Sequence, residues 1–205
     1  MNIAVIGIGG VGGYFGGKLC RLLDDSSLDL KIYFIARNRH LHEIQKNGLL
    51  LDTDEGEFLC KPTFATDTIS NLPELDFCLL CVKSFDLDSV LPQLREKISS
   101  KSTLLPLLNG VDIYERIRRQ IKTGAVFPSC AYVSARIERD GKVTQRGGLC
   151  TIVFGKDPHN DFVDERIFGL LTKARIKHRW QEDPLNISIP SGKKKFELLI
   201  GVRPF

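Results

Sequence analysis

Short apolar runs alternate with amphipathic stretches along the first half of the chain. The run NIAVIG at residues 2–7 is rich in β-branched residues and ends in glycine, which predicts a buried strand of a parallel sheet. Residues 12–25 carry apolar side chains at helical spacing, and residues 30–37 form a second apolar run. Residues 39–48 predict a short helix that Gly48 closes. Strand and helix in this rhythm predict βαβ units.

The pattern changes at residues 48–67, where apolar and polar residues alternate around the turn DTDEGE. This alternation predicts an antiparallel hairpin inserted into the βαβ order. An Asp-Gly pair within residues 139–148 predicts a second turn, which leads to a return strand. The remaining strands are expected at 76–83, 102–110, 125–138, 149–155 and 177–180, and the remaining helices at 88–98, 111–121 and 161–176.

Together these elements predict an α/β fold. We expect a Rossmann-like, doubly wound and mainly parallel sheet with an antiparallel extension. Residues 182–205 contain three prolines and two glycines without a clear period, so they predict no complete element.

Charge and hydropathy exclude two classes of partner. The 205 residues carry 29 basic and 25 acidic side chains, a net charge of +4, whereas nucleic-acid binding normally needs a concentrated basic face. No apolar stretch has the length needed to cross a bilayer, and the N-terminal MNIAVIGIGG lacks the basic region of a signal peptide. We therefore expect a soluble, cytoplasmic protein with no nucleic-acid or membrane partner.

Cysteine spacing gives one candidate for metal or redox chemistry. Cys78 and Cys81 form a C-x-x-C pair, which suits redox chemistry or half of a zinc site. They lie inside the apolar run LDFCLLCVK, however, which predicts a buried strand, and no second pair has metal-ligand spacing. We therefore interpret the six cysteines as small thiols in a reducing compartment and expect no metal site.

Seven glycines crowd residues 7–17, and three of them give the clearest chemical signal. Gly7, Gly9 and Gly12 form G-x-G-x-x-G directly after the first predicted strand and directly before a helix. In this context the first glycine permits a tight turn, the second lets the backbone approach a pyrophosphate, and the third lets the helix pack on the strand. Free N–H groups at the helix N-terminus then attract the phosphates. The candidate cofactor-binding residues in this loop are Gly7, Ile8, Gly9, Gly10, Val11 and Gly12.

Other residues near the loop refine this picture. Packing of the helix explains Gly16 and Gly17 better than phosphate binding does. At the end of the second strand, an acidic residue would bond the ribose hydroxyls of NAD. Arg37 stands there instead, and its guanidinium suits the 2′-phosphate of NADP. Arg39 is better explained as a solvated loop residue.

Several segments, in sequence order, resemble the ketopantoate reductase (2-dehydropantoate 2-reductase) family. They are IAVIGIGGVGGYFGGKL, IARNRHLHEIQKNGLLL, CLLCVKSFDLDSVLPQL, LLPLLNGVDIYERI and SCAYVSARIERDGKVTQRGG. The resemblance runs from residue 1 to about residue 180. It is specific because the VKS and LNG motifs follow the glycine loop in the family's order and at its intervals.

The resemblance implies that NADPH is the cofactor, held by the glycine loop and Arg37. It also implies that Lys83 and Asn109 line the cleft beside the cofactor and a keto-acid substrate. Both residues end predicted strands, where open α/β sheets bind ligands, although a solvated lysine and an Asn-Gly turn explain them equally well. The implied reaction is the NADPH-dependent reduction of 2-dehydropantoate to pantoate in pantothenate and coenzyme A biosynthesis.

The end of the chain departs from the family pattern. We expect residues 1–180 to be the NADP-binding domain and residues 181–205 to be a remnant or aberrant tail. The family's helical second domain, with its general-acid lysine and a substrate-binding glutamate, is expected to be largely missing. Lys195, beside Phe196, is the nearest match to that lysine, although a solvated lysine is the preferred interpretation. Truncation or a frame shift near residue 190 would explain this tail, because codons for Pro-Ser-Gly can encode Ile-Trp in another frame. The competing explanation is a natural short protein with a tail of its own.

Two other functions stay open on the sequence. The chain could belong to a reductase of another keto acid with the same architecture, or it could be a non-catalytic NADP-binding module. NADPH oxidation with 2-dehydropantoate, measured together with NADPH binding, would separate them. A homodimer is compatible with the resemblance, although the usual dimer contacts would lie in the second domain.

Overall fold

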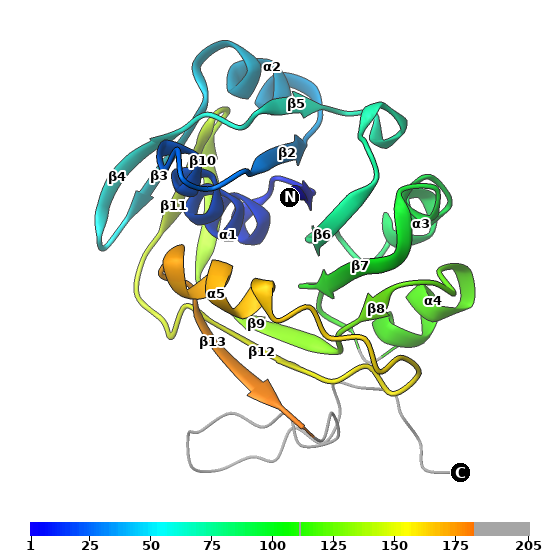
Figure 1. Ribbon diagram of the computed structural model, residues 1–205. Helices are drawn as coiled ribbons and strands as arrows, with labels where there is room; N and C mark the ends of the chain where they lie inside the picture. The colour runs from blue at the N-terminus through cyan, green and yellow to red at the C-terminus, as the bar shows by residue number, and fades with distance from the viewer. Residues whose placement is uncertain (111, 183–205) are drawn as a thin grey trace.

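The computed structural model describes residues 1–110 and 112–182. At its centre is a six-stranded sheet in the order β5-β2-β1-β6-β7-β8, in which every neighbouring pair is parallel (Figure 1). Its strands are β1 (Asn2–Ile6), β2 (Lys31–Ile35), β5 (Phe64–Thr66), β6 (Leu75–Leu80), β7 (Ile98–Pro106) and β8 (Ala125–Val126).

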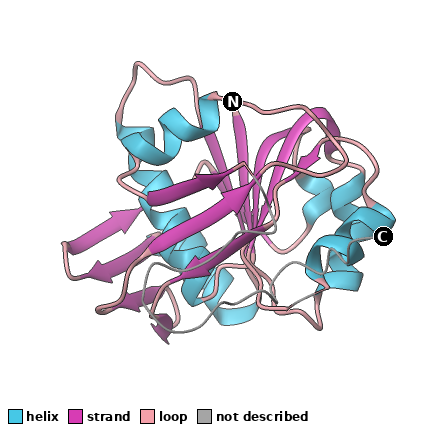
Figure 2. Ribbon diagram, turned by 90° about the horizontal axis from the view of Figure 1, so that it is seen from below, coloured by secondary structure: helices cyan, strands magenta, loops and turns pink. Residues whose placement is uncertain are grey.

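Helices cover both faces of this sheet, as Figure 2 shows from below. They are α1 (Gly10–Cys20), α2 (Asn38–Asn47), α3 (Leu87–Arg95) and α4 (Ile113–Gln120), with short 3-10 turns η1 (Arg21–Asp24) and η2 (Ile69–Asn71). Ile3 and Val5 of β1 belong to the core that contains α1 and α2, whereas Ala4 and Ile6 belong to the core that contains α3 and α4. Burial on both faces explains why the strands are continuous apolar runs. The predicted doubly wound α/β fold is confirmed.

A second, four-stranded sheet covers the side of α1 that faces away from the main sheet (Figure 1). Its order is β10-β11-β3-β4. The strands are β3 (Leu49–Thr53), β4 (Gly56–Cys60), β10 (Ala135–Arg139) and β11 (Lys142–Gln145). β3 and β4 form the predicted antiparallel hairpin, and β3 pairs in parallel with β11. The hairpin therefore builds a separate sheet, and α1 lies between the two sheets.

This double packing explains why α1 is so rich in glycine. A Cβ added at Gly13 would lie 2.6 Å from Val143 of β11, and a Cβ added at Gly17 would lie 2.8 Å from Leu51 of β3. On the other side of the helix, a Cβ added at Gly16 would lie 3.1 Å from a β1 side chain. The packing role expected for Gly16 and Gly17 is confirmed, because an added Cβ would press on a neighbouring side chain at both positions, most closely at Gly17.

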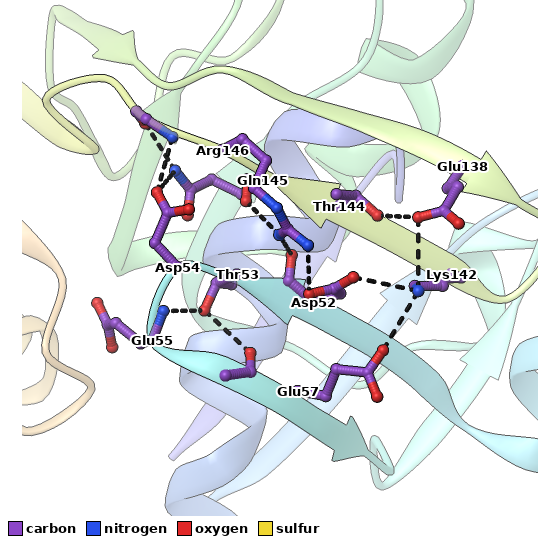
Figure 3. A network of polar contacts seen from close by, with 12 residues as sticks. Asp52, Thr53, Asp54, Glu55, Glu57, Glu138, Lys142, Thr144, Gln145 and Arg146 are labelled. Atoms are coloured by element: carbon purple, nitrogen blue, oxygen red, sulfur yellow. Dashed lines mark hydrogen bonds and ion pairs between the residues drawn. The ribbon is translucent and has the colours of Figure 1, made fainter.

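The opposite face of the second sheet carries a network of charged side chains (Figure 3). Lys142 of β11 lies in its middle, with Nζ 3.1 Å from Asp52 and 3.2 Å from Glu57. Arg146 Nη2 lies 2.8 Å from the same Asp52, and its hydrogen bond holds the pKa of this carboxyl below the usual value. The network thus joins β3, β4 and β11 across their strands.

Residues 125–138 were expected to form one strand, and this expectation is wrong. Their residues are divided among three sheets: β8 lies in the main sheet, β9 (Ser129–Tyr132) pairs antiparallel with β12 (Thr151–Gly155), and β10 lies in the second sheet. Pro128 lacks an amide hydrogen for a strand ladder and separates β8 from β9. The Asp-Gly turn is present, but it joins β10 to β11. The antiparallel strands therefore lie in two smaller sheets beside the main one.

α5 (Arg166–Lys173) and β13 (Lys177–Gln181) complete the described chain, and β13 pairs in parallel with β12. α5 is shorter than the helix expected at 161–176. At its start the Asp164 carboxylate accepts a hydrogen bond from the Arg166 amide at 3.0 Å, which favours a turn before the helix. Near its end Arg175 has a φ of 53°, which interrupts a right-handed helix. Lys195 and nearly all of the expected tail lie outside the described residues.

Candidate functional site

A cavity of about 320 Å³ opens at the carboxyl ends of β1, β2 and β6. Gly7, Ile8 and Gly9 line it from the loop after β1, Arg37 from the end of β2, and Lys83 from the loop after β6. β1 connects to β2 on one side, whereas β6 lies on its other side, so the cavity lies at the point where the strand order reverses. Open α/β sheets bind their ligands at this point.

The loop after β1 is held to its neighbours through its backbone. The amides of Gly7 and Ile8 both donate to the Ile35 carbonyl, at 2.9 and 3.0 Å, and the Gly9 amide donates to the Gly7 carbonyl at 2.9 Å. Gly7 has a φ of 97°, which favours glycine. A Cβ at Gly7 would also lie 3.0 Å from the backbone of Cys81. Both the backbone conformation at residue 7 and the space around it therefore favour glycine over any other residue.

Gly9 leaves open space where a ligand could approach. It lines the cavity at the N-cap of α1, and, apart from its neighbours in the chain, no atom of the described residues lies within 4 Å of the position that its Cβ would occupy. The amides of the first helical turn, which begins at Gly10, have no acceptor inside the helix. Such amides, together with the helix dipole, favour an anion. The loop can therefore hold a phosphate or pyrophosphate group, as the glycine spacing predicts.

Two cationic side chains face the same cavity. Arg37 is 54% exposed, and its Nη1 lies 3.1 Å from the Asp86 carboxylate. Lys83 lines the cavity without an ion pair to any residue of the described chain. The structure thus brings together the glycine loop, Arg37 and Lys83, which the sequence singles out from segments far apart in the chain.

His40 forms part of the cavity wall, although no motif in the sequence marks it. It is buried, and its Nδ1 accepts a hydrogen bond from the Gly141 amide at 3.1 Å. Burial lowers the pKa of His40. A neutral ring that accepts at Nδ1 carries its proton on Nε2. His40 therefore links α2, beside the cavity, to the turn between β10 and β11.

Replacing His40 with asparagine is expected to weaken the dependence of stability on pH between 8 and 5. The unfolded chain takes up the His40 proton near its ordinary pKa of about 6.5, before the folded protein does, so stability is lost as the pH falls through that range. Asparagine keeps an acceptor for Gly141 but cannot titrate, so the stability cost at pH 8 should stay below about 1.5 kcal/mol. Urea unfolding at several pH values measures both effects.

The matched control is the exposed His42 on the same helix. His42→Asn should keep the pH dependence of the unmodified protein. If His40→Asn also keeps it, His40 is not the titrating group.

The remaining cavity wall was not found from the sequence. Asp67 directly follows β5, so the rule that strand ends carry ligand groups could have indicated it. Asp86 lies directly before α3 and away from the end of β6, so this rule does not indicate it. Ser89 and Gln93 lie one turn apart on α3, and no sequence pattern marks them. The apolar part of the wall is formed by Ile6, Ile8, Ile35, Ala36, Ile69, Cys81, Val82, Val90 and Ile137.

Asn109, Gly10, Val11 and Gly12, which were also expected at the site, are not among the residues that line this cavity. Asn109 is exposed beyond the end of β7 and does not line this cavity. Gly10 packs against β10, since an added Cβ would overlap the Ala135 carbonyl. Gly12 packs against the Gly7 carbonyl in the same way. Val11 is partly buried in the first turn of α1.

The structure also bears on the cysteines and on other possible sites. All six cysteines are free thiols, and burial raises the pKa of both Cys78 and Cys81. Across residues 1–110 and 112–182, no three His, Cys, Asp or Glu side chains gather as they would around a metal ion. Over the same ranges, no helix has the length and apolar character needed to cross a membrane.

Comparison with known proteins places this site in context. A family model described as "Ketopantoate reductase PanE/ApbA" matches residues 3–159. The 2-dehydropantoate 2-reductase of Streptococcus pyogenes serotype M6 is 25% identical over 187 residues, which cover 89% of this chain and 57% of that protein. The uncharacterized oxidoreductase YkpB of Bacillus subtilis is 24% identical over 156 residues, which cover 76% of this chain and 49% of YkpB.

A solved structure shows the same arrangement of elements. The 2-dehydropantoate 2-reductase from Porphyromonas gingivalis W83 matches with a TM-score of 0.79 and 35% sequence identity. The match covers 89% of this chain and 64% of that one. The chain spans about half the length of the curated relatives that it matches.

Proposed function

The chain belongs to the ketopantoate reductase (PanE/ApbA) family, and we propose that its cavity binds NADPH for the reduction of 2-dehydropantoate to pantoate. The observation that carries this proposal is the open space at Gly9, which lies in the cavity beside the free amides of α1. A dinucleotide pyrophosphate needs such a close approach to the backbone.

Each element of the cavity has a role in this proposal. The amides at the start of α1 hold the pyrophosphate, and Arg37 binds the 2′-phosphate of NADPH through paired hydrogen bonds. Gly7 and Gly12 keep the loop and the helix close enough to the strands for this contact. When bound, the nicotinamide supplies the hydride that the keto carbon accepts.

The substrate roles are proposed from the same edge of the sheet. Lys83 lines the cavity without an ion pair to a described residue, so its ammonium group can attract the carboxylate of a keto acid. Asn109 is proposed to hold the keto oxygen from the neighbouring loop. The keto oxygen also needs a proton, for which Lys195 is the candidate donor. Lys195 lies outside the described residues, and a solvated lysine is the competing interpretation.

Two measurements on the full chain test the proposal. NADPH binding is followed by fluorescence titration, and NADPH oxidation is followed by absorbance with 2-dehydropantoate as the substrate. Binding together with turnover is the expected result. If only other 2-keto acids are reduced, the chain is a reductase of a different keto acid. If NADPH binds without turnover of any keto acid, the chain is a non-catalytic nucleotide-binding module. Absence of NADPH binding would overturn the proposal as a whole.

A further inference from the structure

An ion pair crosses the cavity where Arg37 would meet the 2′-phosphate. Arg37 Nη1 lies 3.1 Å from Asp86 Oδ1, and both residues line the cavity. Arg37 follows β2, whereas Asp86 lies between β6 and α3, so the pair joins the two sides of the crevice. Asp86 is 27% exposed, so its charge is only partly hydrated. A ligand that needs Arg37 must therefore compete with a carboxylate that already holds it.

The backbone of Asp86 is fixed by its neighbours. Its amide donates to the Lys83 carbonyl at 2.9 Å, and its carbonyl accepts from the Ser89 amide at 3.2 Å. Asp86 occupies the N-cap of α3, yet its carboxylate makes no capping hydrogen bond. An aspartate at this position normally caps the helix, so here the carboxylate is left to pair with Arg37.

The loop that carries Asp86 is also tied to α4. Arg116 Nη2 donates to the Ser84 carbonyl at 2.9 Å and to the Asp88 carboxylate at 2.9 Å. These bonds flank Asp86 on both sides in the sequence. The backbone that carries Asp86 is therefore held at several points, so the carboxylate can leave Arg37 only by rotation of its own side chain.

The two nicotinamide nucleotides would meet this charge differently. NADPH brings a doubly charged phosphate to Arg37, and Asp86 repels that phosphate while it neutralises part of the guanidinium charge. NADH brings a hydroxyl in the same place, and a hydroxyl can donate a hydrogen bond to a carboxylate. We propose that Asp86 is a specificity-determining residue that weakens the preference of this cavity for NADPH, so that NADH is accepted as well. This inference rests on the proposed nucleotide function.

Replacing Asp86 with asparagine tests the inference with NADPH and NADH as the probes. Removal of one like charge close to the phosphate is expected to tighten NADPH binding by about tenfold. NADH binding should stay the same or weaken, so the ratio of the two dissociation constants should shift toward NADPH. The shift should shrink as salt is added, because screening weakens charge effects but not changes in shape. Fluorescence titration of the full chain measures both constants.

Asp88 provides a matched control in the same helix. It is an aspartate paired to an arginine at 2.9 Å, but it does not line the cavity. Its removal leaves the bond from Arg116 to the Ser84 carbonyl in place, so the loop that carries Asp86 stays tied to α4. Asp88→Asn should therefore leave the ratio within about twofold of the unmodified protein. Arg37→Ala should shift the ratio of the two dissociation constants in the opposite direction, because loss of the guanidinium should remove the preference for NADPH.

Each outcome supports or overturns a separate claim. If Asp86→Asn weakens NADPH binding, the carboxylate serves to orient Arg37 toward the phosphate, and the inference is wrong. An unchanged ratio also overturns it, while leaving the proposed function intact. If the unmodified chain binds neither nucleotide, the proposed function fails, and the inference fails with it. Urea unfolding checks that Asp86→Asn is folded. Its free energy of unfolding should lie within about 1 kcal/mol of that of the unmodified protein, because the Arg37 side of the pair is exposed.

Discussion

Replacing Gly12 with alanine is expected to destabilise the protein by about 3 kcal/mol or more and to abolish nucleotide binding. A Cβ at this position would overlap the Gly7 carbonyl oxygen and lie 3.0 Å from Cys81 Cβ. The obstructing atom at Gly7 belongs to the backbone, so no change of rotamer can relieve the overlap. The loop or the helix must move, and the loop geometry that would hold a phosphate is lost. Urea unfolding and NADPH titration measure the two effects.

Gly9→Ala is the matched control, because it separates folding from binding. No atom of the described residues beyond the neighbouring backbone lies within 4 Å of the added methyl group. Gly9 has a φ of −94°, so alanine there does not need the left-handed conformation that favours glycine. Stability should therefore change by less than about 1 kcal/mol. The methyl group would enter the space that the pyrophosphate needs, so NADPH affinity should fall by about tenfold or more. Normal NADPH binding by Gly9→Ala would contradict this account of the loop, as would unchanged stability of Gly12→Ala.

Asp157→Ala is expected to cost about 3–5 kcal/mol of stability. Asp157 is 1% exposed and forms an ion pair with the buried Arg118 of α4. It also accepts hydrogen bonds from the Tyr114 hydroxyl and from the Val126 amide, each at 2.6 Å. Its removal leaves the Arg118 charge and two polar groups without this partner in the core. The variant would lose the contact between α4, β8 and the segment after β12.

Denaturant unfolding measures this effect, with Asp161→Ala as the control. Asp161 also pairs with a basic residue, since its Oδ1 lies 2.6 Å from Lys156, but it is 96% exposed. Its removal should change stability by about 0.5 kcal/mol or less. Similar effects of the two substitutions would show that the buried pair does not hold α4 to the rest of the molecule.

Most strands of the main sheet could be predicted from the sequence, whereas the pairing of strands in the two smaller sheets could not. Strands β1, β2 and β6 are covered on both faces, so each appears as an uninterrupted apolar run. Residues 125–138 are also apolar, yet they pair with strands from three different parts of the chain. Local periodicity cannot show which distant strand a residue will pair with, so the division at Pro128 was missed.

The same distinction applies to the site. The glycine loop, Arg37 and Lys83 follow strands of the parallel sheet, and their positions along the sequence were enough to bring them together. His40 was missed because its partner, Gly141, lies 101 residues away along the chain. Asp86 was missed because it lies in the loop before the helix expected at 88–98, where no sequence pattern marks it. Its pairing with Arg37 depends on the tertiary structure.

The position of α1 between two sheets has a consequence for motion in the protein. Glycine usually marks a pliable segment, yet every residue from Gly12 to Cys20 in this helix is buried. Its amide hydrogens can exchange with solvent only when one of the sheets separates from the helix, so they should be among the slowest to exchange. A helix held in this way lets the adjoining loop receive a ligand with little loss of conformational entropy. A glycine-rich helix is thus expected to be one of the most rigid parts of the molecule.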